Sequence, residues 1–206
     1  EGTATSPIVF TSGNTIGNRS RGDWGGVILL GKGSFNINSG INNIEGIPSS
    51  PDTAYGGGAT PDDNDNSGSL KYVRIEYAGY TYGLAGSNTE INGLTMGAVG
   101  RGTKIDYVQV SYANDDSFEW FGGAVDCSHL VAFNGLDDDF DTDNGFSGKV
   151  QFCLAIKQPT AADASDSNCF ETDNNSTSAV GTSFTRAIFS NCTLVGPTYR
   201  STLPSG

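Results

Sequence analysis

The chain has 206 residues, enough for one domain with a substantial core, and its composition excludes several classes of protein. Eleven basic residues against 23 acidic residues give a net charge of −12, which argues against binding to nucleic acid or to anionic membranes. No stretch approaches the roughly 20 apolar residues of a membrane span, so we expect no membrane insertion. Asp and Asn, 17 each, and 29 Gly are turn formers and poor helix residues, which excludes a helical bundle.

Strand-like runs recur along the chain, and no window carries a sustained helical stripe with a cap. In each run, β-branched or aromatic residues alternate with small or polar ones, and Gly, Asn or Asp closes the run. The runs are Pro7–Thr11, Gly26–Leu30, Leu70–Ala78, Ile91–Met96, Ile105–Tyr112, His129–Phe133, Val150–Ile156 and Arg186–Val195. The sequence therefore predicts an all-β chain.

Two series of segments repeat with a period of about 22 residues. One series aligns Tyr107 with Leu130, 23 residues later, and with Phe152, after 22 more. The other aligns Phe118 with Phe140, after 22 residues, and with Phe170, after 30, with an insertion at about 158–168. A period of this length fits one coil of a parallel β-helix, in which equivalent residues stack about 4.8 Å apart.

The segment at about 32–69 is rich in Gly, Asn, Ser and Pro, and it is too polar for the core of a coil. We interpret it as a long excursion from the β-helix. Neither side of the excursion looks self-sufficient, so we expect a single β-helix domain over residues 1–206.

Three motifs also resemble a known family. Arg21–Gly26 (RGDWGG), Asn114–Gly123 (NDDSFEWFGG) and Leu136–Gly145 (LDDDFDTDNG) are similar to segments of large secreted or cell-surface proteins of Bacteroidota. The resemblance implies a right-handed parallel β-helix, export by the type IX secretion route or as a lipoprotein, and further coils before Glu1 and after Gly206. It implies no established biochemical activity.

The stretch from Ile105 to Gly148 carries ten carboxylates and no Lys or Arg. The 22-residue period predicts that Asp115 and Asp116 lie close to Asp137 and Asp138, and that Glu119 lies close to Asp141. Like charges about 5 Å apart repel by on the order of 1–3 kcal/mol. Such pairs need a cation, raised pKa values or splaying into solvent.

Carboxylates at this density favour Ca²⁺, and Asp139-x-Asp141-x-Asp143 has the alternating spacing of a calcium loop. We therefore predict at least one structural Ca²⁺ ion, held by some of eight carboxylates. These are Asp115, Asp116, Glu119, Asp137, Asp138, Asp139, Asp141 and Asp143. The alternative is a solvated stripe in which Asp and Asn side chains bond to the backbone of turns.

The same acids admit an enzymatic interpretation, because parallel β-helices host polysaccharide lyases and polygalacturonases. The Gly-His-Gly and Arg-x-Lys motifs of polygalacturonases do not occur, and a lyase needs a basic residue over the acidic cleft. We expect a non-catalytic, secreted or cell-surface module that acts as a stalk, a fibre or a glycan-contacting surface. Its partners would be surface glycans or further copies of itself, joined end to end. The alternative is a secreted carbohydrate-active enzyme that uses the Asp137–Asp143 cluster.

Four cysteines show no CxxC pair, which argues against a structural zinc site. Cys153 and Cys192 lie in strand segments of similar pattern, so we expect them on neighbouring coils. They would be within disulfide reach if residues 158–182 are looped out. Four free thiols are the alternative.

Overall fold

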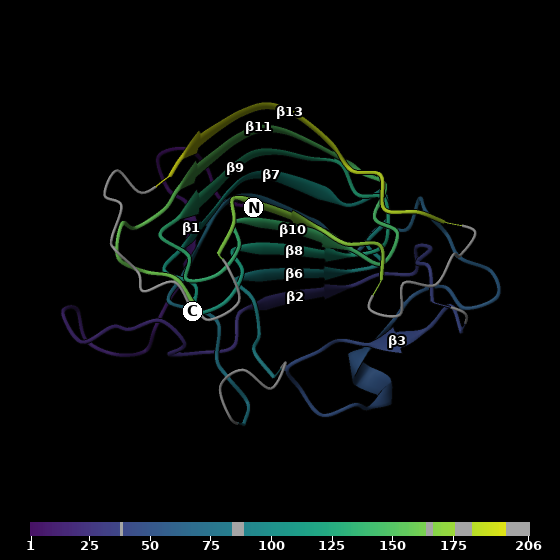
Figure 1. The fold of residues 1–206 in the computed structure, drawn as a ribbon, viewed down its shortest axis with the longest axis horizontal. Coiled ribbons are helices and arrows are strands. Elements are labelled where there is room, and N and C mark those ends of the chain that lie inside the picture. The colour runs from purple at the N-terminus through teal and green to yellow at the C-terminus, as the bar shows by residue number, and fades with distance from the viewer. Residues whose placement is uncertain (38, 84–88, 164–166, 176–182, 197–206) are drawn as a thin grey trace, which may run out of the picture.

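The structure, a computed structural model, describes residues 1–37, 39–83, 89–163, 167–175 and 183–196, and its strands alternate between two parallel sheets (Figure 1). The six-stranded sheet has the order β1 (Ile8–Phe10), β5 (Ser69–Glu76), β7 (Lys104–Ser111), β9 (Cys127–Phe133), β11 (Lys149–Ile156) and β13 (Ile188–Val195). The five-stranded sheet has the order β12 (Phe170–Thr172), β10 (Phe140–Asp143), β8 (Phe118–Phe121), β6 (Leu94–Gly97) and β2 (Val27–Leu30). Each coil contributes one strand to each sheet, so the predicted all-β parallel β-helix is confirmed.

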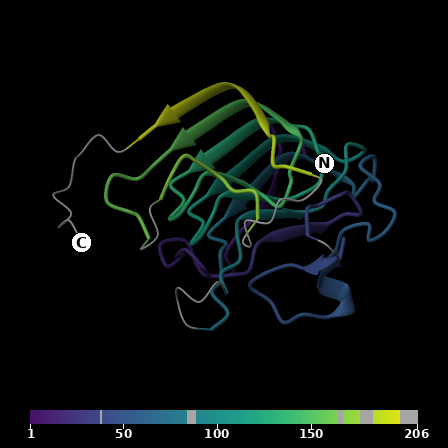
Figure 2. The same cartoon turned by 45° about the vertical axis from the view of Figure 1, so that its right-hand side comes forward.

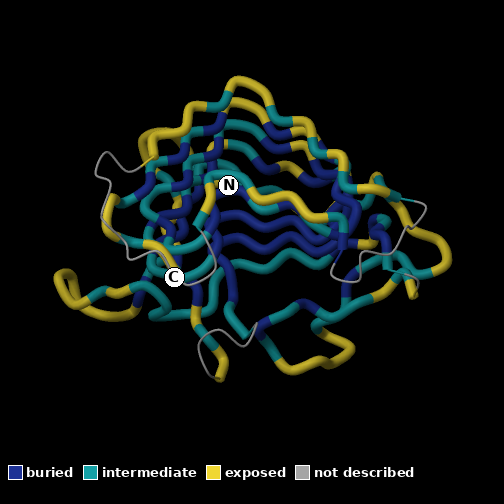
Figure 3. The backbone as a smooth tube through the Cα atoms, viewed as in Figure 1, coloured by how far each residue is buried: buried dark blue, intermediate teal, exposed yellow. Residues whose placement is uncertain are grey.

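The five-stranded sheet owes its register to a row of phenylalanines that points into the core. Phe140 lies opposite Phe118 on one side and Phe170 on the other, as the 22- and 30-residue spacings predicted. The ring centroids of each neighbouring pair are 5.6 Å apart. Phe118 and Phe140 are fully buried, and the inner strands of this sheet form the most deeply buried part of the tube in Figure 3.

The predicted register of the six-stranded sheet is wrong by one residue. Val108, not Tyr107, lies opposite Leu130, and a parallel pair shifted by one residue exchanges its two faces. Tyr107 instead stacks on His129, with 4.1 Å between ring centroids, and His129 stacks on Phe152 at 5.1 Å. Val108 and Leu130 therefore point into the core, whereas this ring stack lies on the outer surface.

Each long strand of the six-stranded sheet bends at one residue with left-handed backbone geometry. The residues in this row are Tyr72, Tyr107, His129, Phe152 and Asn191, with φ between 52° and 59°. Non-glycine residues seldom adopt this conformation, and here it recurs at the same position on successive coils. The row therefore forms a corner of the β-helix, which turns the sheet around the core.

The segment between β2 and β5 lies outside the coils and carries its own small sheet (Figure 2). It contains β3 (Asn42–Asn43), the 3₁₀ helix η1 (Pro51–Thr53) and β4 (Ala54–Tyr55), with β3 and β4 antiparallel. Its apolar side chains, Phe35, Ile44 and Tyr55, form a second core with Ala98 and Phe121, which flank or belong to the five-stranded sheet.

Gly97 makes this packing possible, because a Cβ there would lie 2.6 Å from the ring of Tyr55. The excursion consequently covers part of the outer face of the five-stranded sheet.

Of the predicted insertion at about 158–168, residues 164–166 lie outside the described part of the chain. No helix among the described residues is long and apolar enough to cross a membrane.

Candidate metal centre

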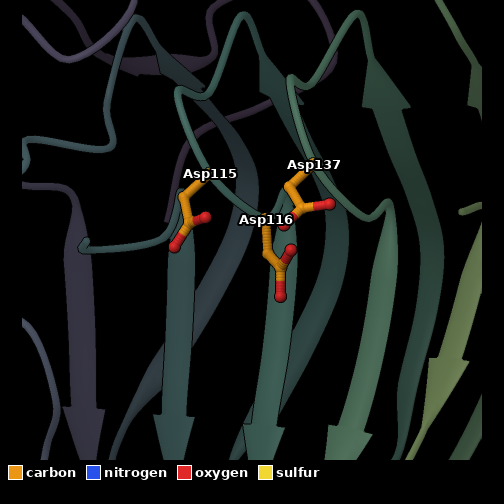
Figure 4. A group of neighbouring side chains, drawn as sticks. All are labelled: Asp115, Asp116 and Asp137. Carbon is orange, nitrogen blue, oxygen red and sulfur yellow. The ribbon is translucent and has the colours of Figure 1, made fainter. Parts of the chain in front are cut away.

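Three carboxylates gather where the chain enters β8 and β10. Asp115 and Asp116 precede β8, and Asp137 occupies the matching turn one coil later, before β10. One oxygen from each lies within 4.8 Å of the others, and Figure 4 shows the Asp116 and Asp137 carboxylates side by side. Asp116 is buried, while Asp115 and Asp137 are half-buried.

A second triplet continues from the first along the outer face of the sheet. Glu119 on β8 lies in register with Asp141 on β10, because the inward phenylalanines place the following residue of each strand outward. One oxygen of each lies within 4.8 Å of the other and of Asp116. Asp116 thus belongs to both triplets, and the sequence expectation that these acids lie close together agrees with the geometry.

Glu45 adds a carboxylate that the sequence analysis missed. It lies in the excursion, between Ile44 in the second core and Gly46, which is held against the backbone of Glu90. Its side chain lies beside those of Glu119 and Asn92, both of which act on the pKa of its carboxyl group. Nothing in the repeat pattern marks Glu45, because it lies about 70 residues before its partner in a segment without repeats.

Burial and mutual repulsion disfavour the charged form of five acids in this group. Desolvation, followed by repulsion from neighbouring carboxylates, raises the pKa of Asp115 to about 8. Desolvation is also the main cause that raises the pKa of Glu45 to about 7 and that of Asp141 to about 7. The same two causes raise the pKa values of Asp116 and Glu119 well above the ordinary range.

Two neutral side chains bring further oxygens to this group. Asn92 is 1% exposed and donates through its amide nitrogen to Glu119, but its Oδ1 has no hydrogen-bond partner. Thr95, also 1% exposed, lies in register with Glu119, and its Oγ1 has no partner either. Buried polar atoms are rarely left unpaired, so these two oxygens mark a place for a ligand that accepts electron pairs.

The other predicted ligands are placed differently. Asp138 accepts a hydrogen bond from the backbone of Asn168, and its own backbone N–H donates to Asp116 at 2.9 Å. Asp143 accepts from the backbone N–H of Asn144 at 2.5 Å.

Asp139 is fully buried directly before Phe140, and its Oδ2 lies 3.8 Å from the Nζ of Lys157. Asp139 therefore lies outside both carboxylate triplets, whereas Asp141 belongs to the second. Asp141 and Asp143 lie on β10, whereas Asp139 precedes this strand.

Basic side chains are scarce around this group. Among the ion pairs of the described residues, only that of Lys157 with Asp139 involves a carboxylate between 115 and 143. Lys157 is buried and also donates to the backbone carbonyl of Asp137. His129 lies on the other sheet, with its Nδ1 2.8 Å from Asp106.

A pocket of about 430 Å³ opens beside Glu45. The residues Asn42–Ser49 form one wall, and Tyr82 and Thr89 form the other. Tyr82 is 56% exposed, and Asn42 and Asn43 supply amide groups. The pocket thus combines an aromatic ring with polar groups, next to a carboxylate of the metal candidate.

A family model described as a pectate-lyase-like β-helix domain matches residues 1–203. The chain belongs to this family. Domains of the pectate-lyase-like β-helix type are usually extracellular, and the type fits both structural modules and carbohydrate-active enzymes. No curated protein and no solved structure gave a significant match.

Proposed function

We propose that this pectate-lyase-like β-helix domain is a non-catalytic extracellular module in which Ca²⁺ fastens the excursion to the coils. The observation that carries the proposal is the pair of carboxylate triplets that share Asp116 and meet Glu45 from the excursion. The resemblance of the sequence to Bacteroidota surface proteins supports the extracellular location.

The choice of ion follows from the ligand atoms. Asp116, Glu119, Asp141 and Glu45 offer carboxylate oxygens, and Asn92 offers an unpaired amide oxygen. Ca²⁺ takes six to eight oxygen ligands in flexible geometry, whereas Zn²⁺ prefers nitrogen and sulfur. A divalent cation would also remove the repulsion that now disfavours ionisation of these acids.

The surroundings of the acids favour a structural role over catalysis. A lyase needs a base that removes a proton from the uronate ring. Lys157, which pairs with a carboxylate of this stretch, is buried against Asp139. The excursion also covers part of this face. The alternative function is a carbohydrate-active enzyme that uses Asp137–Asp143. A turnover assay on polysaccharides distinguishes it from the proposed structural role.

The pocket beside Glu45 supports a glycan as the partner. Tyrosine rings pack against the apolar faces of sugars, while amide groups hydrogen-bond to their hydroxyls. Tyr82 and the pair Asn42 and Asn43 provide both kinds of group in one concave site.

End-to-end assembly of copies is supported by the two edge strands of the six-stranded sheet, each of which pairs on one side only among the described residues. The edge strands β1 and β13 expose backbone groups together with apolar side chains such as Val9 and Leu194, which are 43% and 41% exposed. An unpaired edge of this kind can pair with another strand. We expect light scattering at increasing protein concentration to show association, and a constant monomer mass would contradict it.

The test of the cation site is calorimetric titration of Ca²⁺ into metal-free protein. We expect binding by the native chain, and a loss of at least tenfold in affinity for Asp116→Asn, because both triplets lose a charge. Asp52→Asn is the matched control, since Asp52 is exposed on η1 and its substitution removes the same charge. Absence of Ca²⁺ uptake by the native chain, or equal affinity in both variants, would refute the proposal.

The test against catalysis uses a panel of acidic and neutral polysaccharides with Ca²⁺. Reducing ends and the absorbance of unsaturated uronates are then measured. We expect binding without turnover. Turnover that Asp141→Asn abolishes would establish the enzymatic alternative.

A further inference from the structure

The last two strands of the six-stranded sheet bring two cysteines together. Cys153 on β11 lies in register with Cys192 on β13, so the prediction that they lie on neighbouring coils is confirmed. Neighbouring strands of a sheet are about 4.8 Å apart, which falls inside the Cα–Cα range of about 4.4–6.8 Å for disulfides. Both residues directly follow a corner residue, Phe152 or Asn191, so the same bend precedes each cysteine.

Both cysteines of this pair pack at the main core. Cys153 is 3% exposed and belongs to the main core, and Cys192 packs against that core from the last strand. The Sγ of Cys192 donates to the backbone carbonyl of Ser190 at 3.6 Å. All four cysteines carry free thiols in the structure.

The other two cysteines are less well placed to pair. Cys127 lies in register with Val150, three residues before Cys153 along β11. Cys169 directly precedes β12 of the five-stranded sheet and packs against the main core. Of the possible pairings, the register therefore favours the one between β11 and β13.

We propose that Cys153 and Cys192 form a disulfide in an oxidising environment and so lock the last coil onto the β-helix. The thiolate of Cys192, the more accessible of the two, attacks a small disulfide such as oxidised glutathione and releases one glutathione thiol. The sulfur of Cys153 then attacks Cys192 in the mixed disulfide and releases the second thiol. Two protein thiols are thereby oxidised, one glutathione disulfide is reduced to two thiols, and no other reactant is needed.

The bond would act where the coil is weakest. Most residues of β13 are exposed, and its free edge has no neighbouring strand in the described part of the chain. The disulfide would close a loop between residues 39 positions apart, which restricts the unfolded chain. Burial raises the pKa of the Cys153 thiol to about 12, which slows its attack and keeps the reduced pair stable enough to isolate.

The test uses the full chain with excess Ca²⁺ throughout, so that the state of the metal site does not affect the result. The protein is incubated in a buffer of oxidised and reduced glutathione, denatured, alkylated with iodoacetamide and digested for mass spectrometry. We expect alkylation of Cys127 and Cys169 and a linked peptide pair that contains Cys153 and Cys192, 2 Da lighter than the sum of its reduced peptides. Alkylation of all four cysteines, or linkage through Cys127 or Cys169, would overturn the proposal.

Thermal unfolding gives a second readout. Dithiothreitol should lower the Tm of the oxidised native chain by roughly 10 °C, as expected for a loop of this length. Cys192→Ser should remove this sensitivity, whereas Cys169→Ser should retain it. Equal sensitivity in both variants would contradict the assignment, and the mass analysis of the native chain decides the question if Cys192→Ser does not fold.

Discussion

The two sheets of the β-helix treat carboxylates in opposite ways. On the six-stranded sheet, Asp106 lies 3.3 Å from the Nζ of Lys71 and accepts hydrogen bonds from Ser128 and His129. Desolvation acts against its ionisation, but these partners outweigh it and keep the pKa of Asp106 below its ordinary value.

On the five-stranded sheet, Asp116, Glu119 and Asp141 face one another, and burial and repulsion raise their pKa values. The same coil period can thus produce a surface whose carboxylates are paired with other protein groups, or a site whose carboxylates need a ligand. The difference lies in what faces the acids. Asp106 has Lys71 and hydrogen-bonding side chains on neighbouring coils, whereas the acids of the five-stranded sheet meet further acids and the covering excursion.

The largest effect that separates the two sheets should come from chelation. Removal of bound Ca²⁺ with EDTA should lower the Tm by about 10 °C, because a ligand at roughly 1,000 times its dissociation constant contributes about 4 kcal/mol. Differential scanning calorimetry with and without EDTA measures this, and returning Ca²⁺ should restore the Tm. An unchanged Tm would mean that the acids of the five-stranded sheet need no cation.

The metal-free protein should also lose stability as the pH rises. In unfolded chains these acids ionise near pH 4, whereas the folded-state pKa values of Glu45 and Asp115 are about 7 and about 8. Between these values the folded state holds more protons than the unfolded state, so the free energy of unfolding falls with increasing pH. Urea denaturation should therefore show lower stability at pH 8 than at pH 5, and a smaller loss when Ca²⁺ is present. A metal-free protein that gains stability over this range would contradict the raised pKa values.

The excursion should respond to one of its own carboxylates. Glu45→Gln removes a charge that contacts Glu119, so we expect a severalfold weaker Ca²⁺ affinity and a loss of the cation's protection against proteolysis within residues 32–69. Asp52→Asn, a charge change in the same segment, should leave both unchanged. Limited proteolysis with and without Ca²⁺ tests this. Identical digestion of both variants would show that the cation does not fasten the excursion to the coils.

The smallest effect should come from the six-stranded sheet. Surface ion pairs contribute about 0–1 kcal/mol, so Asp106→Asn should lower the Tm by less than about 4 °C, and it should not alter Ca²⁺ affinity. Calorimetry on the same samples provides the measurement. A loss as large as that caused by chelation would remove the contrast between the sheets.

The sequence predicted the five-stranded sheet better than the six-stranded one for a physical reason. Phe118, Phe140 and Phe170 are large inward residues that recur at one position of the coil, so their spacing reports the register directly. In the other sheet the inward residues are small or variable, and the aromatic row at Tyr107 and Phe152 belongs to the corner. Hydrophobic alternation does not reveal a left-handed residue within a strand, which explains the error of one residue.

The candidate site, like the fold, could be predicted from the sequence only where its residues repeat from coil to coil. Period arithmetic correctly placed Asp116 near Asp137 and Glu119 near Asp141, because these pairs follow from stacking alone. It did not predict that Asp139 pairs with Lys157, and it missed Glu45, which reaches the site through tertiary packing of the excursion. Contacts between a repeat and a segment outside the repeat leave no periodic signal.

The most direct test of the cation site is a crystal structure of the native chain grown with Ca²⁺ and then soaked with a lanthanide. Lanthanide ions favour the same oxygen ligands and give strong anomalous scattering. We predict an anomalous peak among the carboxylates of Asp116, Glu119 and Asp141, with Glu45 beside it. The absence of a peak there, with these carboxylates paired to one another through shared protons, would contradict the account.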